Sequence, residues 1–200
     1  MTNLDLLRKR LCRERLRMPS AARAAAAATT AERVRRLDIY RQARHVAVYI
    51  AVRGELDLAC LWSHAPAEKH WYLPVVHPGA DRTMQFALHD PAKAMRKNRF
   101  GILEPDVSQT AVLDPRELDM VLAPLVAFDG SGHRIGMGAG FYDRAFSFLR
   151  GAGAPRRPLL VGVGYEFQRI DNIEPAPWDV PLAGVVTEQA TYGNLKEGNE

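Results

Sequence analysis

Apolar residues gather into several long runs along the chain, separated by stretches rich in turn-forming and charged residues. The longest runs lie at residues 45–52, 70–76, 118–128, 159–165 and 181–188. A run that is apolar at nearly every position, rather than at alternate ones, is typical of a strand in a parallel sheet that helices cover on both faces. We therefore expect five buried strands in these ranges, with a shorter strand at residues 83–89.

Helical spacing dominates the N-terminal part of the chain. Leu4, Leu7 and Leu11 recur every three or four residues among arginines, which predicts an amphipathic helix. Ser20 follows a proline and is expected to cap a second, alanine-rich helix that runs to about Arg44.

Further helical stretches alternate with the predicted strands. Asp57 can cap a helix over residues 58–65, and residues 141–150 carry apolar side chains at helical spacing. Residues 90–116 hold prolines and charges without a clear period, so we expect irregular structure there. The alternation predicts an α/β class of protein, a single-domain layered fold with a mostly parallel sheet flanked by helices. No internal repeat or change of composition divides residues 1–200, so one domain is expected.

The charge of the chain is unevenly distributed. The net charge is +4, but residues 1–44 hold 12 Lys or Arg and four acids, whereas the remaining residues carry more acids than bases. A basic segment can bind nucleic acid or a polyphosphate, and it can equally form a solvated helix face. No aromatic residue interleaves these charges before Tyr40, which favours the solvated helix face over a nucleic-acid surface.

Apolar run length and cysteine content bear on the compartment. The apolar runs are shorter than the roughly 20 residues that a membrane-spanning helix needs, and no apolar stretch of the secretory type follows the basic N-terminus. Cys12 and Cys60 are the two cysteines and have no paired spacing, which indicates a reducing compartment. We expect a cytoplasmic protein without a membrane segment, and a buried, inert Cys60 thiol within its predicted helix.

Alternating glycines form the most distinctive motif of the sequence. Gly136, Gly138 and Gly140 make a G-x-G-x-G pattern shortly after a predicted buried strand and at the start of a predicted helix. Backbone N–H groups at such a position can bind a phosphate. The spacing matches neither a dinucleotide-binding fingerprint nor a Walker loop. A tight strand-to-helix turn without a ligand is equally compatible with the pattern.

Charged residues beside the glycines add chemistry to the loop. Arg134 can clamp phosphate oxygens, Tyr142 offers a hydroxyl or a ring, and Asp143 can hold Mg²⁺ together with phosphates. Asp143 can instead simply favour the positive end of a helix. Glu55 directly follows a predicted buried strand, so its carboxylate should lie at the ligand-binding edge of the sheet, unless it only pairs with Arg53.

Several segments together resemble one enzyme family. YIAVRGELD, WYLPVV, NRFGILEPD, LDMVLAPLVAFDGSGHRIGMGAGFYDR, LLVGVGYEFQ and PWDVPLAGVVTE occur in the order seen in the 5-formyltetrahydrofolate cyclo-ligases, also called 5,10-methenyltetrahydrofolate synthetases. The resemblance implies a ligase of folate and one-carbon metabolism. Its partners would be ATP and 5-formyltetrahydrofolate, Mg²⁺ would be its cofactor, ADP and phosphate would be released, and the enzyme would be a monomer.

The resemblance also implies roles for particular residues. Catalytic roles fall to Arg134, Tyr142 and Asp143, with Asp143 as the Mg²⁺ ligand. ATP contacts are implied for Arg8, Arg134, Gly136, Met137, Gly138, Ala139, Gly140, Phe141 and Tyr142. Folate contacts are implied for Ile50, Glu55, Met137 and Phe141.

The chain departs from the family pattern at three places. Arg8 retains the first charge of an N-terminal Lys-x-x-Leu-Arg motif, but Cys12 replaces its arginine, and nearby Arg13 is a candidate substitute. Ala139 stands where the glycine loop often has a basic residue.

The third departure is near the C-terminus, where an acid associated with the metal falls at Ala183 and leaves Asp179 as the nearest carboxylate. These departures leave a second hypothesis open, a catalytically silent folate- or nucleotide-binding relative. A basic nucleic-acid-binding module is the third.

Overall fold

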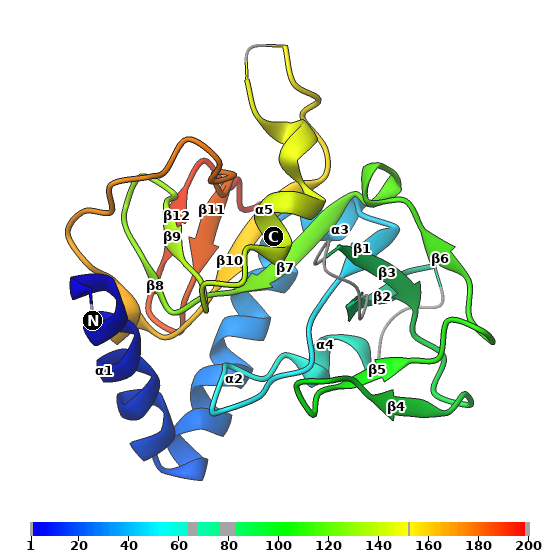
Figure 1. The fold of residues 1–200 in the computed structure, drawn as a ribbon, viewed down its shortest axis with the longest axis horizontal. Coiled ribbons are helices and arrows are strands. Elements are labelled where there is room, and N and C mark those ends of the chain that lie inside the picture. Colours follow the sequence, from blue (N-terminus) through cyan, green and yellow to red (C-terminus); the bar gives the residue numbers. More distant parts are fainter. Residues whose placement is uncertain (1, 64–67, 77–82, 152, 199–200) are drawn as a thin grey trace.

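A single eight-stranded sheet runs through the part of the chain that the computed structural model describes, which is residues 2–63, 68–76, 83–151 and 153–198. From one edge to the other, its strands are β12 (Thr191–Gly193), β11 (Gly184–Val186), β10 (Leu159–Val163), β7 (Met120–Pro124), β1 (His45–Ala47), β2 (His70–Val76), β3 (Met84–Leu88) and β6 (Val112–Leu113). The five strands from β11 to β2 are parallel, and the outer pairs are antiparallel. The predicted α/β fold with a mostly parallel sheet is confirmed (Figure 1).

Alternate residues of the parallel strands enter two separate cores. Val46, Met120 and Leu122 belong to one buried cluster, whereas Ala47 and Val121 belong to another on the opposite face. This alternation follows from the two-residue period of a strand, and it explains why both sets of positions are apolar in the sequence.

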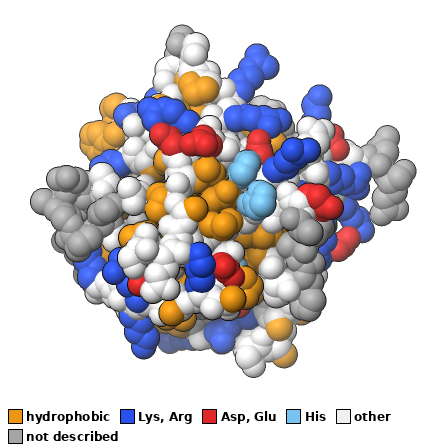
Figure 2. Space-filling model, turned by 90° about the vertical axis from the view of Figure 1, so that its right-hand side faces the viewer, with side chains coloured by type: hydrophobic (Ala, Val, Ile, Leu, Met, Phe, Trp, Pro, Cys, Tyr) orange, Lys and Arg blue, Asp and Glu red, His pale blue; other side chains and the backbone are white. Residues whose placement is uncertain are grey.

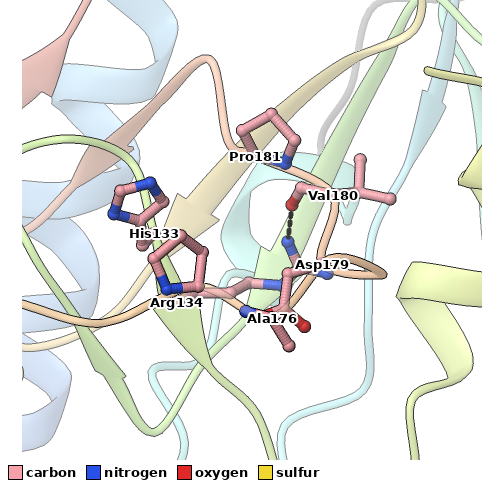
Figure 3. Close-up of a pocket in the computed structure, with 7 residues that line it drawn as sticks. His133, Arg134, Ala176, Asp179, Val180 and Pro181 are labelled. Carbon is pink, nitrogen blue, oxygen red and sulfur yellow. Dashed lines mark hydrogen bonds between the residues drawn. The ribbon is translucent and has the colours of Figure 1, made fainter. Parts of the chain in front are cut away.

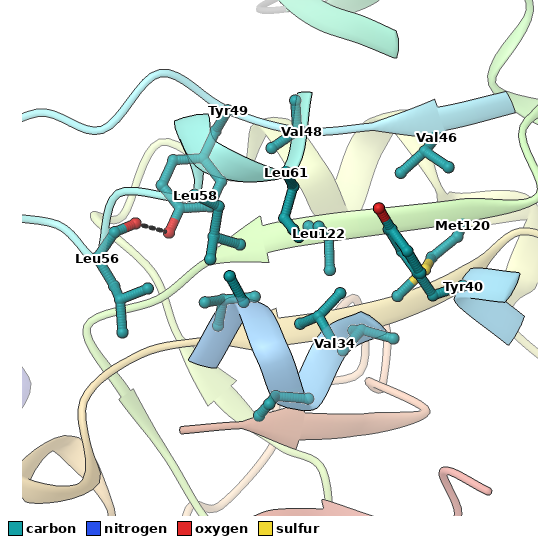
Figure 4. Close-up of a cluster of buried hydrophobic side chains, with 14 of the residues drawn as sticks. Val34, Tyr40, Val46, Val48, Tyr49, Leu56, Leu58, Leu61, Met120 and Leu122 are labelled. Atoms are coloured by element: carbon teal, nitrogen blue, oxygen red, sulfur yellow. Dashed lines mark hydrogen bonds between the residues drawn. The ribbon is translucent and has the colours of Figure 1, made fainter. Parts of the chain in front are cut away.

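Helices cover both faces of the sheet. One face packs against α2 (Ser20–Arg36), α3 (Asp38–Gln42) and α4 (Ala59–Trp62), and Figure 4 shows side chains from α2 and α4 meeting around Leu122 of β7. The other face packs against α5 (Phe141–Ala145) and the 3-10 helix η2 (Ser147–Leu149). The glycine motif therefore begins the helix that covers one side of the sheet.

The first helix, α1 (Asn3–Arg17), packs beside a small hairpin rather than on the main sheet (Figure 1). This hairpin consists of β8 (Ala127–Phe128) and β9 (Arg134–Ile135). Leu11 is 2% exposed and packs in a cluster with Val126 and Ile135. The hairpin leads directly into the glycine loop, so the packing of Leu11 brings α1 to that loop.

The second predicted helix is wrong at both ends. Pro19, not Ser20, occupies the N-cap, and no side chain caps the helix there. The helix ends at Arg36, because Leu37 takes an extended conformation with ψ 131°. Leu37 is fully buried and forms a β-bridge with Glu197, so tertiary contacts break a helix that local propensity would continue.

Residues 90–116, predicted to be irregular, contain regular structure. β4 (Met95–Lys97) and β5 (Leu103–Pro105) form a hairpin, β6 joins the main sheet, and η1 (Pro115–Glu117) follows. Glu104 of β5 is 3% exposed and accepts hydrogen bonds from Asn98 Nδ2 at 3.1 Å and from the Val76 backbone N–H at 3.2 Å. A buried acid bound to one nearby and one distant donor supports this hairpin without any apolar period in the sequence.

Several predicted ranges are longer than the observed elements. The strand predicted at 118–128 divides into β7 and β8 because Val126 turns to pair with Ile135. The strand predicted at 45–52 ends at Ala47, and the last strand is β12, beyond the predicted 181–188. The helix predicted at 141–150 divides into α5 and η2.

The helix predicted at 58–65 corresponds to α4, and residues 64–65 lie outside the described residues. Leu58, not Asp57, occupies the N-cap, although the Asp57 carboxylate accepts the Ala59 backbone N–H at 2.9 Å. Cys60 is exposed, so the expected buried thiol is wrong. Leu61 is the residue of this helix that is buried in the protein core.

The side of the molecule seen in Figure 2 carries charges of both signs. On that side of the molecule, basic side chains are separated by acidic and hydrophobic ones. Among the described residues, no helix has the length and apolarity to span a membrane.

Candidate functional site

Three chain segments meet at the carboxyl ends of the parallel strands. The turn around Glu55 follows β1, Leu125 follows β7, and Tyr165 follows β10. The Tyr165 hydroxyl donates to the Gly54 carbonyl at 3.2 Å, and Gln168 Nε2 donates to the Leu125 carbonyl at 3.0 Å. The predicted position of Glu55 at this edge of the sheet is confirmed, and ligands of open α/β sheets bind at such edges.

The glycine loop, residues 136–140, connects β9 to α5. Gly138 and Gly140 have φ values of +90° and +66°, a region that residues with a side chain rarely adopt. Met137 at the crest is 50% exposed. The loop therefore needs glycine for its conformation, and its crest is open to solvent.

Helix α1 brings side chains onto the glycine loop across a long sequence separation. Arg8 Nε donates to the Gly136 carbonyl at 2.9 Å, and an added Cβ at Gly138 would lie 3.7 Å from the Arg8 guanidinium carbon. One turn later, Cys12 Sγ lies 3.8 Å from Met137 Sδ. The structure thus places both Arg8 and Cys12 beside the glycine loop.

Arg134 and Asp143 form a close ion pair at the end of the loop. Their Nη2 and Oδ1 atoms are 2.6 Å apart, and the Val180 backbone N–H also donates to Asp143 Oδ1, at 3.2 Å. Arg134 Nη1 donates to the Val180 carbonyl, as Figure 3 shows. The Arg134 side chain is only 7% exposed, so the pair is fixed between the loop and the segment that contains Val180.

A pocket of about 230 Å³ lies against Arg134. His133, Asp179, Val180 and Pro181 contribute to its wall (Figure 3). Asp179 Oδ2 accepts the Ala176 backbone N–H at 2.8 Å, which shapes the loop around this pocket. Among the described residues, no group of three or more His, Cys, Asp or Glu gathers as a metal site. A cation bound here would be coordinated by only one or two protein carboxylates, and its other ligands would come from a bound molecule or water.

Glu55 pairs with Arg15 and not with Arg53. Arg15 Nη2 lies 3.7 Å from Glu55 Oε1, and the Val52 backbone N–H donates to Glu55 Oε2 at 3.1 Å. Burial raises the pKa of Glu55, whereas the Val52 hydrogen bond and the charges of Arg15 and Arg53 act in the opposite direction. Glu55 is thus a mostly buried carboxylate at the carboxyl edge of the parallel strands.

Arg15 contacts Glu55 and was not singled out from the sequence. Arg13, the candidate substitute for the missing arginine of the family motif, is exposed. Arg15 is 1% exposed and lies on the same helical face as Arg8 and Cys12. Its spacing from Leu11, four residues earlier, was the available signal, since Leu11 marks the buried face of this helix.

The remaining predicted residues border this region in different ways. Burial raises the pKa of Tyr142, the nearby charge of Glu55 adds to that effect, and so its phenol stays protonated. Phe141 contacts Phe100 of the β4–β5 hairpin edge-on, with ring centroids 6.0 Å apart. Ile50 is partly buried and packs against the hydrophobic core. Phe100 is 47% exposed and was not singled out from the sequence.

Two of the family departures leave only backbone groups at their positions. The Ala139 carbonyl accepts a hydrogen bond from the Arg144 guanidinium. Ala183 donates its backbone N–H to the Leu160 carbonyl at 2.8 Å, so it continues the sheet.

The sequence as a whole matches one family of enzymes. The sequence model of the 5-formyltetrahydrofolate cyclo-ligase family matches residues 2–188. The chain belongs to this family. Its relatives include the 5-formyltetrahydrofolate cyclo-ligases of Haemophilus influenzae, 37% identical over 73% of this chain and 76% of the relative, and of Escherichia coli K12, 38% identical over 75% and 81%.

Solved structures agree with the family assignment. The NMR structure of Aquifex aeolicus 5,10-methenyltetrahydrofolate synthetase has a TM-score of 0.81 and 29% identity, and covers 100% of this chain and 96% of its own. A Mycoplasma pneumoniae 5,10-methenyltetrahydrofolate synthetase shares the fold, with a TM-score of 0.70 and 21% identity over 94% and 99% of the two chains. The family and the enzyme class predicted from the sequence are confirmed.

Proposed function

We propose that this chain converts 5-formyltetrahydrofolate to 5,10-methenyltetrahydrofolate at the expense of ATP, with release of ADP and phosphate. The observation that carries this proposal is that helix α1 contacts two candidate ligand-binding parts, the glycine loop and the turn around Glu55. The glycine loop with Arg8 and the Arg134–Asp143 pair forms one part, and the Glu55 turn forms the other. The first suits a nucleotide phosphate and the second suits the N–H groups of a pterin.

The proposed reaction has two chemical steps. The γ-phosphoryl group moves from ATP to the formyl oxygen, which gives an imino-phosphate and ADP. The neighbouring anilino nitrogen then attacks the formyl carbon and loses its proton, and the carbon–oxygen bond breaks to release phosphate. Such phosphoryl transfer depends on positioning and charge stabilisation, so the site needs no side-chain nucleophile.

In this proposal each part of the site has a separate role. The glycine loop and the first two residues of α5, with Arg8 and Arg134, bind and orient the phosphates, while the protonated Tyr142 phenol can donate a hydrogen bond. Ile50, Glu55, Met137 and Phe141 hold the folate. Glu55 would accept pterin N–H groups, which fixes the formyl oxygen relative to the phosphoryl group.

Asp143 would hold Mg²⁺ together with ATP phosphates. Magnesium is usually bound by one or two carboxylates plus substrate phosphates and water, and a partly exposed carboxylate beside a phosphate-binding loop fits this preference. When bound, the ion neutralises phosphate charge. Asp179, on the wall of the neighbouring pocket, is a candidate second carboxylate.

The experiment that tests the proposal follows the near-ultraviolet absorbance of methenyltetrahydrofolate. Purified protein is mixed with 5-formyltetrahydrofolate, with and without MgATP. We expect a signal that requires both ATP and Mg²⁺. Binding of 5-formyltetrahydrofolate without any turnover would contradict the proposal and favour the catalytically silent relative. RNA binding that weakens steeply with salt, without turnover, would favour the nucleic-acid module.

We also propose that the enzyme acts as a monomer in the cytoplasm, with residues 1–200 forming one domain. Light scattering of the purified protein would measure its mass directly. A dimer mass would contradict the monomer.

A further inference from the structure

Arg15 has the largest fully buried side chain among the described residues, although it is a cation on a surface helix. Its exposed fraction is 1%, whereas Arg13 and Arg17 on the same helix are exposed. Burying a guanidinium is unfavourable unless its donors find acceptors and its charge finds a partner. The surroundings of Arg15 therefore have to compensate for its desolvation.

The guanidinium of Arg15 meets acceptors from two other segments and from its own helix. Its Nε donates to the Arg53 carbonyl at 3.1 Å, and its Nη1 donates to the Leu125 carbonyl at 3.4 Å. Its Nη2 lies 3.7 Å from Glu55 Oε1 and 3.9 Å from Cys12 Sγ. Arg15 thus connects α1 to the turn after β1 and to the loop after β7.

The turn that Arg15 contacts has an unfavourable backbone conformation. Arg53 is the non-glycine residue with positive φ, +51°, within the described ranges, and the next residue, Gly54, has φ +74°. The carbonyls of both residues are held, Arg53 by Arg15 and Gly54 by the Tyr165 hydroxyl. A conformation of this kind persists where its surroundings over-determine it, and such positions cluster at ligand sites.

We propose that Arg15 is a positioning residue of the folate site: it holds the turn of residues 52–55 and the Glu55 carboxylate in the geometry that receives the pterin. This inference rests on the proposed function and adds to it a residue that does not touch the substrate. Because Arg8 and Cys12 of the same helix contact the glycine loop, α1 also sets the distance between the Glu55 turn and the phosphate-binding loop.

Arg15 affects the protonation of Glu55 as well as its position. The charged groups that act on it are Arg15 and Arg53, and the phenols of Tyr49 and Tyr142 lie within electrostatic reach. Burial raises the pKa of Glu55, and Arg15 opposes that rise. Removal of Arg15 would therefore let Glu55 take up a proton at a higher pH, and a protonated Glu55 accepts fewer N–H groups.

The test compares Arg15→Met with Arg17→Met, which removes an exposed arginine from the same helix. Equilibrium binding of 5-formyltetrahydrofolate without ATP, measured by calorimetry, should weaken about tenfold in Arg15→Met and stay unchanged in Arg17→Met. In steady-state assays, the KM for 5-formyltetrahydrofolate should rise more than the KM for ATP. The acid limb of the kcat/KM profile for folate should move to higher pH, because Glu55 loses its cationic partner.

Two further variants separate positioning from general loss of structure. Arg15→Lys keeps the charge but loses the forked geometry, so it should restore the pH profile and only part of the affinity. Val185→Ala creates a cavity in the hydrophobic core on the other face of the sheet. It serves as a control that lowers stability without altering the surroundings of Glu55. If Arg15→Met does not fold, Arg15→Lys and Glu55→Gln carry the test.

A double variant completes the argument. If Arg15 acts through Glu55, then Arg15→Met should weaken folate binding much less in a Glu55→Gln background than in the unaltered protein. Equal losses in both backgrounds, or an unshifted pH profile in Arg15→Met, would overturn the positioning role. An unaltered protein that neither binds 5-formyltetrahydrofolate nor turns it over would instead refute the proposed function on which the inference rests.

Discussion

Asp129 places the loop residues that precede the glycines. Its side chain is 2% exposed, and its Oδ1 accepts the backbone N–H groups of Ser131 at 2.9 Å and His133 at 3.0 Å. Its Oδ2 accepts His133 Nδ1 at 2.9 Å and the Ile173 backbone N–H at 3.0 Å. One carboxylate therefore connects the β8–β9 turn to the segment around Ile173. These contacts fix the position of the backbone that leads into Arg134.

A pH-dependent contribution to stability follows from this residue. Burial alone would raise the pKa of Asp129, but its hydrogen bonds, led by that of the His133 side chain, outweigh burial and lower it. The carboxylate thus stabilises the fold above its unfolded-state pKa, and this stability is lost as pH falls through the lower, folded-state pKa. Asp129→Asn loses two acceptor contacts at Oδ2, so it should lower the free energy of unfolding at pH 7 by about 1–3 kcal/mol.

Urea unfolding of Asp129→Asn at several pH values checks this expectation. The difference from the unaltered protein should shrink in acid, where Asp129 itself is protonated. Asp171→Asn, at an exposed acid, serves as the control. A difference that stays constant from pH 7 down to pH ~2 would contradict the assigned role of the charge.

At the scale of elements, α1 depends on few anchors because it does not join the main sheet. Leu11 is its most buried apolar residue, whereas Leu16 on the same helix is 56% exposed. Leu11→Ala should cost about 2–5 kcal/mol of stability, because it leaves a cavity against the β8–β9 hairpin. It should also weaken ATP binding, since Arg8 then loses its fixed approach to Gly136.

Thermal unfolding and ATP titration of Leu11→Ala, beside Leu16→Ala, measure both effects. Leu16→Ala should change neither stability nor ATP affinity appreciably. Loss of stability in Leu11→Ala with unchanged ATP affinity would show that α1 does not position Arg8.

The elements that sequence patterns predict well are those whose environment is uniform along their length. The strands β1, β2, β7 and β10 are apolar on both faces, because helices cover both faces of the sheet, and each lies within a predicted apolar run, although β1 and β7 are shorter than their runs. The β4–β5 hairpin was missed because it depends on Glu104 bonding to Asn98 and to distant Val76. Leu37 breaks a helix for a similarly remote reason, its bridge to Glu197.

At the scale of the whole molecule, the candidate site joins segments that are far apart in the chain. The glycine pattern and its neighbours Arg134 and Asp143 were recognisable because loop, cation and acid are contiguous in sequence. Arg15 was not, because its role depends on Glu55 and Leu125, which lie 40 and 110 residues further along the chain. Local patterns report the parts of a site, and only the fold reports which parts face one another.

Binding at such a site must stabilise the whole fold, because the ligand contacts would be lost on unfolding. MgATP at about 100 times its Kd should add about 2.7 kcal/mol to the free energy of unfolding and raise Tm by roughly 5–10 °C. Asp143→Asn removes the proposed magnesium ligand and also breaks the pair with Arg134, so each variant is compared with its own ligand-free Tm. The shift with MgATP should shrink in Asp143→Asn, while the shift with ATP and a chelator should stay similar in both proteins. An undiminished MgATP shift in Asp143→Asn would contradict the metal role, and would do so without any measurement of turnover.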